Sequence, residues 1–339
     1  MPDKDNYAIV SFAFMFVTLC LNPTIQKTLV FEKFHHAEVN RAKESFTDIS
    51  GKGVNVSRVL AQLKKPVLHI TQLTKEEKSF FKRELKKQKI ELFSIKTAAK
   101  ARICTTIIEE NMSKNDNIVR SITELVENGN KVEPKTEIHL KKNFDKLLKK
   151  AKNNFKIDAF VISGSKAPGF NDSLFAELAL KAHANKILTV LDIRGADLKE
   201  LLNALRNNPI KADETPIIIK PNVLELKETF FANQAENSSE FFEERIKFLL
   251  MDIFEKYGIL SIITRGKNST LAFDGKNFIV MPSKKLNPAK IINTIGCGDS
   301  FTAGFVAAMS ECKNFIESLK QGVECASLNA LTIRPGSIF

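Results

Sequence analysis

The feature that most constrains the fold is a regular alternation of helical and strand-like segments from residue 135 onward. Short apolar runs predict strands at 159–163, 188–192, 216–220 and 260–264. Amphipathic segments between them predict helices over about 137–153, 171–185, 195–206, 222–231, 239–256, 298–310 and 314–330. Strands separated by helices of this length predict an α/β fold with a mostly parallel sheet covered on both faces.

An apolar run near the N-terminus predicts a buried first strand over 16–21. The whole run, 8–21, is too short to span a bilayer, and it lacks the flanking charges and cleavage pattern of a signal peptide. We therefore expect no membrane association. Met15 precedes the strand and offers an alternative start, which would make residues 1–14 an extension outside the native protein.

Two β-rich pieces do not fit the alternation of strands and helices. They cover about 24–48 and 90–123, and they predict a small appended sheet that acts as a lid. In parallel sheets of this kind, ligands bind beyond the carboxyl ends of the strands. The residues that directly follow each strand are therefore the first candidates for a functional site.

Composition narrows the classes of partner. The formal net charge is +12, but much of the excess lies in Lys-rich helical stretches such as 82–89 and 141–152, typical of solvated helix faces. Without a recognition motif we expect no nucleic-acid binding, while a basic field favours phosphorylated substrates. The 5 cysteines form no CxxC pair, which predicts neither disulfides nor a zinc site and indicates a cytoplasmic protein.

The strongest chemical signal lies at residues 293–299. A predicted strand ends at Thr294, and Gly296-Cys297-Gly298-Asp299 opens a helix. Two glycines allow a tight turn that aims backbone N–H groups at one point, where the helix dipole favours negative charge. Such an anion hole suits a phosphoryl group, and Asp299 could accept a proton from an attacking hydroxyl. The alternative is an ordinary helix turn with a carboxylate cap.

The segment from Asn293 to Phe301 resembles the C-terminal signature of the PfkB, or ribokinase-like, carbohydrate kinases. Other segments resemble family motifs in the family's order. They are Leu19-Cys-Leu-Asn-Pro23, Ser50-Gly-Lys-Gly-Val-Asn-Val-Ser-Arg58, Arg102-Ile103, Ser163-Gly-Ser165 and Lys220-Pro-Asn-Val-Leu-Glu225. The opening segment and Arg102 resemble the branch that contains 1-phosphofructokinase and tagatose-6-phosphate kinase.

This resemblance implies a three-layer α/β/α kinase domain over residues 15–336, with the lid inserted in it. It implies ATP and Mg²⁺ as cofactors and a sugar phosphate as substrate. The expected reaction is phosphorylation of fructose 1-phosphate to fructose 1,6-bisphosphate, with tagatose 6-phosphate or fructose 6-phosphate as alternative acceptors. It also implies a homodimer that pairs through the lid.

The resemblance further implies roles for individual residues. Asp299 would be the general base, with the backbone of Gly296, Cys297 and Gly298 as anion hole. The sugar phosphate would meet Gln26, Gly51, Lys52, Asn55, Arg102 and Ser163, with Arg102 on the phosphate. The nucleotide would meet Lys220, Asn222, Glu225, Thr264, Arg265, Gly266 and Asn329, and Glu225 would hold Mg²⁺ through water.

One departure bears on the sugar. The family pattern Asn-Pro-x-x-Asp places a carboxylate that accepts hydrogen bonds from sugar hydroxyls, whereas this chain has Gln26 at that position. A neutral amide both donates and accepts, so the substitution weakens or redirects sugar recognition. Gln26 therefore leaves open an alternative of another class, a non-catalytic sensor of sugar phosphates or nucleotides on the same fold.

Overall fold

The computed structural model describes residues 14–112, 118–231 and 239–339. Its strands are β1 (Phe14–Cys20), β2 (Thr24–Phe31), β3 (Glu44–Ser50), β4 (Val67–Leu73), β5 (Ile90–Lys96), β6 (Arg102–Met112), β7 (Ile118–Val126), β8 (Lys156–Ser163), β9 (Leu188–Asp192), β10 (Ile217–Ile219), β11 (Leu260–Ile263), β12 (Thr270–Phe273) and β13 (Phe278–Met281). Its helices are α1 (Lys52–Gln62), α2 (Lys75–Lys87), α3 (Pro134–Asn154), α4 (Leu174–Ala184), α5 (Gly195–Leu205), α6 (Val223–Phe230), α7 (Ser239–Tyr257), α8 (Cys297–Ser310) and α9 (Phe315–Asn329), with a 3₁₀ turn at Pro288–Lys290.

Within the described residues, a 9-stranded sheet runs in the order β13-β12-β11-β10-β9-β8-β1-β4-β5. The strands from β11 to β5 pair in parallel, and β12 and β13 add an antiparallel edge. Neighbouring residues of β1 point to opposite faces, so Val17 and Leu19 enter one core cluster and Phe16 the other.

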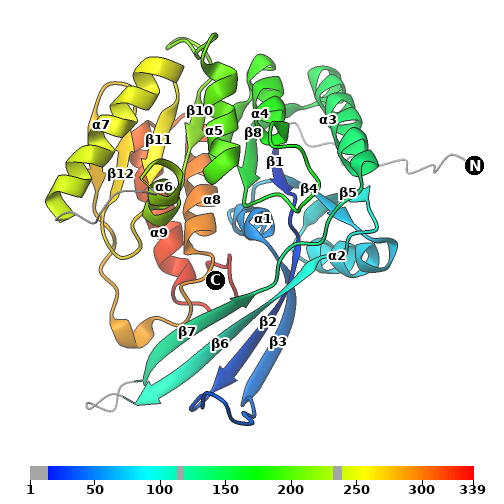
Figure 1. The fold of residues 1–339 in the computed structure, drawn as a ribbon, viewed down its shortest axis with the longest axis vertical. Coiled ribbons are helices and arrows are strands. Elements are labelled where there is room, and N and C mark those ends of the chain that lie inside the picture. The colour runs from blue at the N-terminus through cyan, green and yellow to red at the C-terminus, as the bar shows by residue number, and fades with distance from the viewer. Residues whose placement is uncertain (1–13, 113–117, 232–238) are drawn as a thin grey trace, which may run out of the picture.

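Helices cover both faces of this sheet (Figure 1). Apolar side chains of α3, α4 and α5 fill one face, and those of α1, α2, α8 and α9 fill the other. A smaller cluster seats α6 and α7 against β11 and β12. The expected three-layer α/β/α architecture with a mostly parallel sheet is confirmed.

The remaining strands form the lid, a 4-stranded sheet in the order β3-β2-β6-β7 within the described residues. It projects from one side of the body, as Figure 1 shows. The β2–β6 pair is parallel, and the two outer pairs are antiparallel. The expected lid sheet is thus confirmed. The chain enters it at β2, directly after the short turn that follows β1.

Three details of the sequence-based expectations are corrected. Residues 90–96, which we assigned to the lid, form β5 and pair in parallel with β4 at the edge of the large sheet. Residues 291–294 are not a strand, because the Ile292 and Asn293 amides both donate to the carbonyl of Ala330. The first strand begins at Phe14, so Met15 lies inside it, buried; the remainder of the extension, 1–13, lies outside the described residues.

Candidate active site

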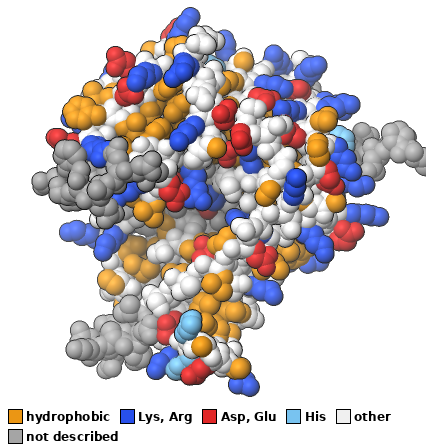
Figure 2. Space-filling view, viewed as in Figure 1, with side chains coloured by type: hydrophobic (Ala, Val, Ile, Leu, Met, Phe, Trp, Pro, Cys, Tyr) orange, Lys and Arg blue, Asp and Glu red, His pale blue; other side chains and the backbone are white. Residues whose placement is uncertain are grey.

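A pocket lies between the carboxyl ends of the large sheet and the lid. The body contributes Gly51, Lys52, Asn55, Asp192, Lys220, Asn222, Glu225, Thr264, Thr294, Ile295, Gly296, Gly298 and Asp299, and the lid contributes Thr24, Gln26, Ser50, Arg102, Cys104, Glu124 and Val126. The surface is hollowed where the lid meets the body (Figure 2). Segments from both ends of the chain meet here because the parallel strands share one edge.

The turn before α8 places a carboxylate at the bottom of this pocket. Gly296 caps the helix with φ 85°, a left-handed conformation that favours glycine, and a Cβ there would lie 2.5 Å from the Gly336 nitrogen. Asp299 follows in the first helical turn and is 5% exposed. Asn55 Nδ2 donates to Asp299 Oδ2 at 2.8 Å, so the carboxylate is held from α1.

The electrostatic setting of Asp299 suits a proton acceptor. Burial raises the pKa of Asp299 to about 7, against the lowering effect of Lys52, the Asn55 hydrogen bond and Lys220. The negative charge of Asp192 raises it further. A carboxylate with a pKa near neutrality can take up a proton and release it again at physiological pH.

A chain of charged side chains lies close enough to Asp299 to affect its pKa. Lys52 Nζ lies 2.9 Å from Glu225 Oε1 and 3.5 Å from Asp192 Oδ2, and Lys220 Nζ lies 3.5 Å from Asp192 Oδ1. Burial lowers the pKa of Lys52, but the charges of Asp192 and Glu225 outweigh it and the net shift is upward. Burial raises the pKa of Asp192, but Lys220 and Lys52 bring it below its usual value. Lys52 and Asp192 are therefore both charged at neutral pH.

At the start of α6, Asn222 and Glu225 cap the helix and also line the pocket. The Asn222 side chain accepts from the Leu224 and Glu225 amides at 2.9 Å, and Glu225 Oε2 accepts from the Asn222 amide at 2.9 Å. This reciprocal arrangement is a capping box, which stabilises the first turn of the helix. The second carboxylate oxygen of Glu225 stays on the pocket side, with Lys52.

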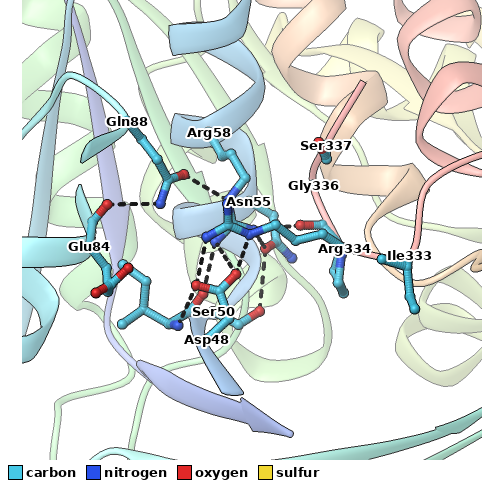
Figure 3. A network of polar contacts seen from close by, with 12 residues as sticks. Asp48, Ser50, Asn55, Arg58, Glu84, Gln88, Ile333, Arg334, Gly336 and Ser337 are labelled. Carbon is cyan, nitrogen blue, oxygen red and sulfur yellow. Dashed lines mark hydrogen bonds and ion pairs between the residues drawn. The ribbon is translucent and has the colours of Figure 1, made fainter. Parts of the chain in front are cut away.

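The amide of Asn55 is fixed from behind by a buried guanidinium (Figure 3). Arg58 Nη1 donates to Asn55 Oδ1 at 3.3 Å and to the carbonyl of Pro335, and Ser50 Oγ also donates to Asn55 Oδ1 at 3.3 Å. With its oxygen occupied by two donors, Asn55 must turn its NH₂ group to Asp299. Arg58 is 1% exposed and also binds Asp48 of β3.

The model of pfkB family carbohydrate kinases matches residues 19–337. The chain belongs to this family. A possible 1-phosphofructokinase from Thermotoga maritima has a similar structure, with TM-score 0.77 and 22% identity over 94% of this chain and 93% of that one. Phosphofructokinase-2 from Escherichia coli follows with TM-score 0.74 and 18% identity over 94% and 93%. Ribokinase from Arabidopsis thaliana has TM-score 0.66 and 18% identity over 95% and 94%.

These similarities show a ribokinase-like fold, and the pocket holds most of the residues that the family resemblance implied. Gln26, Gly51, Lys52, Asn55, Arg102, Lys220, Asn222, Glu225, Thr264, Gly296, Gly298 and Asp299 all line it. They come from both sheets and from three helix starts. Residues from four of the sequence motifs, those around Lys52, Arg102, Asn222 and Asp299, thus meet in one pocket of this pfkB-family kinase.

Other expected site residues are directed elsewhere. Ser163 is 1% exposed and donates to Asp192 Oδ2 at 3.2 Å, behind the pocket wall. The Arg265 guanidinium donates from Nε to the carbonyl of Ser269 and from Nη1 to the Glu243 carboxylate of α7, each at 2.7 Å. Gly266 follows on the same turn, and the pocket lining does not include it.

Asn329 and Cys297 have structural positions rather than pocket positions. Asn329 is 0% exposed; its Oδ1 accepts from Ser300, Gly336 and Ser337, and its Nδ2 donates to the carbonyl of Ile295. It therefore braces the turn before α8, and its amide is not turned to a nucleotide. The Cys297 amide donates to the Thr294 carbonyl at 3.3 Å, so this N–H is already used and does not fit the expected anion-hole role. Burial raises the pKa of the Cys297 thiol to about 11.

Asp192 is a charged pocket residue that motif matching missed. It is 2% exposed, lines the pocket and lies between Lys52 and Lys220. Its signal was present in the sequence, since it ends β9 at the carboxyl edge where ligands bind. The lid residues Cys104, Glu124 and Val126 were also missed, because only the register of β6 and β7 turns them inward.

The pocket carboxylates fit a hydrated Mg²⁺. Asp192 Oδ1 is buried without a hydrogen-bond partner among the described residues, and Glu225 faces the same space. Mg²⁺ is bound by one or two carboxylates together with waters and substrate phosphates. The described part of the chain holds no cluster of three or more His, Cys, Asp or Glu that could enclose a metal alone. Nor does any helix there reach the length and apolarity needed to cross a membrane.

Proposed function

We propose that this pfkB-family kinase transfers the γ-phosphoryl group of ATP to a ketohexose phosphate in the cytoplasm, with fructose 1-phosphate as the first candidate acceptor. One observation carries the proposal: Asp299, with its pKa raised to about 7, shares a pocket with Arg102 of the lid. A base and a guanidinium in one pocket suit an acceptor that carries both a reactive hydroxyl and a phosphate.

In the proposed reaction, the Asp299 carboxylate accepts the proton of the acceptor hydroxyl. The hydroxyl oxygen then bonds to the γ-phosphorus, and the bond to the bridging oxygen breaks to release ADP. Gly296, Gly298, Lys52 and Lys220 line the pocket. In this proposal the backbone N–H groups of the two glycines and the two lysine cations stabilise the charge on the transferred group. Lys52 is held in place by Glu225 and Asp192, so little reorganisation is required.

The two substrates would bind on different sides of the pocket, the nucleotide on the body side and the sugar phosphate on the lid side. Asn222, Thr264 and Glu225 line the pocket on the body side and would meet the nucleotide. When bound, Mg²⁺ would neutralise charge on the phosphates, and Asp192 and Glu225 are the residues placed to hold its water shell. On the lid side, Arg102 would bind the phosphate already present on the sugar, as its fork of N–H donors suits an oxyanion.

The test is a coupled assay of ADP formation with fructose 1-phosphate, tagatose 6-phosphate, fructose 6-phosphate and free fructose. We expect turnover of a phosphorylated ketose and a preference for fructose 1-phosphate. Asp299→Asn should lower kcat by about 10²- to 10⁴-fold and leave ATP affinity within about twofold, since it removes only the proton acceptor. Asp213→Asn, an exposed matched substitution, should have no effect. Undiminished turnover by Asp299→Asn would refute its role as base.

A second candidate is a non-catalytic sensor of sugar phosphates or nucleotides on the same fold. Gln26 favours it, because the neutral amide stands where the family pattern has a carboxylate. Tight ATP binding without turnover of any of the four acceptors would support the sensor and contradict the kinase proposal.

We also propose a homodimer that pairs through the lid. An exposed apolar side chain outside the pocket lining supports it: Leu125 of β7 is 54% exposed. Paired lids would bury this surface. Sedimentation equilibrium should give twice the chain mass, and Leu125→Lys should shift the protein to monomer; a monomeric wild-type protein would contradict the proposal.

A further inference from the structure

We propose that Glu124 of β7 supplies the carboxylate that accepts hydrogen bonds from the hydroxyls of the acceptor sugar. The inference rests on the proposed kinase function and extends it to the determinant of sugar recognition. It accounts for how the sugar hydroxyls could meet a carboxylate although this chain has the neutral Gln26 where the family pattern has an aspartate.

The side chain of Gln26 is already committed within the lid. It is 4% exposed, and its Nε2 donates to Thr106 Oγ1 at 2.8 Å and to the carbonyl of Lys27 at 3.3 Å. Both of its N–H bonds are thus used inside the lid, and only its amide oxygen is left for a ligand. An amide oxygen is a weaker acceptor than a carboxylate oxygen, so recognition of hydroxyls at this position is reduced.

The strand register places Glu124 on the same face of the lid as Gln26. Gln26 pairs with Cys104 and Thr28 with Thr106 across β2 and β6, and Thr106 pairs with Glu124 across β6 and β7. Directly paired residues project to the same side of a sheet. Thr106, which binds the Gln26 amide, is therefore the direct cross-strand neighbour of Glu124. Two strand spacings, about 10 Å, separate β2 from β7, so both residues face one space of sugar size.

Glu124 is also the acidic side chain of the pocket that has no assigned task. The acids that line the pocket within the described residues are Glu124, Asp192, Glu225 and Asp299. Asp192 and Glu225 pair with Lys52, and Asp299 is the proposed base. Glu124 is the acid among them that comes from the lid, the side on which the sugar is expected.

The charge environment of Glu124 supports a role beside the phosphate site. Glu124 is exposed to solvent at the pocket edge; partial desolvation by the surrounding pocket raises its pKa, and the charge of Arg102 lowers it. Arg102 Nε donates to Thr24 Oγ1 at 3.3 Å and its Nη1 to the carbonyl of Glu127 at 3.4 Å. The guanidinium is thus held by β2 and the end of β7, and Glu124 is near enough to feel its charge. An acceptor for hydroxyls and a donor for phosphate thus line the same pocket.

The experiment exchanges the carboxylate between the two positions. Steady-state kinetics and calorimetric binding of the preferred sugar phosphate would be measured for wild type, Glu124→Gln, Gln26→Asp and the double variant. Glu44→Gln, which alters an exposed acid of β3 outside the pocket, is the matched control.

We expect Glu124→Gln to raise the KM and Kd for the sugar phosphate by about 10- to 100-fold, the effect of a lost charge-assisted hydrogen bond. The KM for ATP should stay within about twofold, because the nucleotide lies on the body side. The double variant should regain at least about tenfold of the lost affinity, since Gln26→Asp restores a carboxylate to the same face. Glu44→Gln should match wild type.

Unchanged affinity for the sugar phosphate in Glu124→Gln would overturn the proposal. A loss of affinity that Gln26→Asp fails to restore would also overturn it. In that case Glu124 would act only by orienting Arg102, a role that a carboxylate at position 26 of β2 cannot take over. The kinase proposal is judged separately, by turnover of the wild type. If the wild type binds a sugar phosphate without turnover, the calorimetric Kd values of the variants still decide the role of Glu124. A wild type that neither binds nor phosphorylates any of them would overturn both.

Discussion

At the scale of single residues, the side chains around Asp299 set its proton affinity. Burial raises its pKa to about 7, and the Asn55 hydrogen bond, Lys52 and Lys220 limit the rise. The negative charge of Asp192 raises the pKa of Asp299 further. Asp192 keeps that charge because Lys220 and Lys52 lower its own pKa. In its proposed role as base, Asp299 is active when deprotonated, so its pKa determines the acid side of the pH profile.

The pH profile of kcat/KM should therefore fall as pH decreases through about 7, and approach a tenfold loss per pH unit below it. Asn55→Ala removes a hydrogen bond that lowers the pKa of Asp299, so the inflection should move to higher pH. Profiles of kcat/KM between pH 5 and 9 would measure it, with Asn143→Ala of the exposed α3 face as control. An inflection that stays in place in Asn55→Ala would contradict this account of the base.

At the scale of elements, Arg58 of α1 joins the lid to the body (Figure 3). Its Nη2 donates to Asp48 Oδ2 at 3.1 Å and to the carbonyl of Ile49 at 2.9 Å, both on β3. Arg334, near the C-terminus, binds the other oxygen of Asp48 at 2.7 Å. Burial lowers the pKa of Arg58 to about 10 against the effect of Asp48, but the group stays charged at neutral pH.

Asp48→Ala should lower the free energy of unfolding by about 3 kcal/mol, because it leaves the buried Arg58 cation without its counter-ion. Glu44→Ala, a truncation at an exposed position of the same strand, should change it by less than about 0.5 kcal/mol. Urea denaturation followed by circular dichroism would compare the two variants. Equal stability of both would show that the Arg58 network does not hold β3 to the body.

At the scale of the whole molecule, a buried histidine couples the core to pH. His69 of β4 is 0% exposed and lies 2.9 Å from Thr18 Oγ1 and 3.0 Å from Ser57 Oγ, through Nδ1. Its Nε2 is buried without a partner among the described residues. Burial lowers the pKa of His69 to about 3, so it is neutral in the folded protein.

Below its ordinary pKa of about 6.5, His69 binds a proton in the unfolded chain but not in the folded one. Stability from this group is therefore complete above pH 6.5 and is lost as pH falls, by about 1.4 kcal/mol per pH unit well below 6.5 until about pH 3. The free energy of unfolding of His69→Gln should depend less steeply on pH than that of wild type. Parallel pH dependences for the two proteins would exclude His69 as a source of acid sensitivity.

The limits of the sequence interpretation follow from nonlocal pairing. The segments at 90–96 and 291–294 have the composition of short strands, but one joins the large sheet through β4 and the other bonds to the carbonyl of Ala330. Asn329 resembled a ligand contact until the C-terminal residues Gly336 and Ser337 closed over its oxygen. Each outcome depends on a partner far away in the chain, which local patterns do not identify.

The sequence by itself determined the α/β alternation, the Gly-rich start of α8 and the order of the kinase motifs, because periodicity and turn chemistry are local properties. Tertiary structure alone decided which side chains share the pocket. It placed Asp192 between two lysines and turned the Asn55 amide toward Asp299. It also put Glu124 in the pocket, on the same face of the lid as Gln26, whose N–H groups are already bonded within the lid. Strand register and burial set those contacts, and both arise only when distant segments pack together.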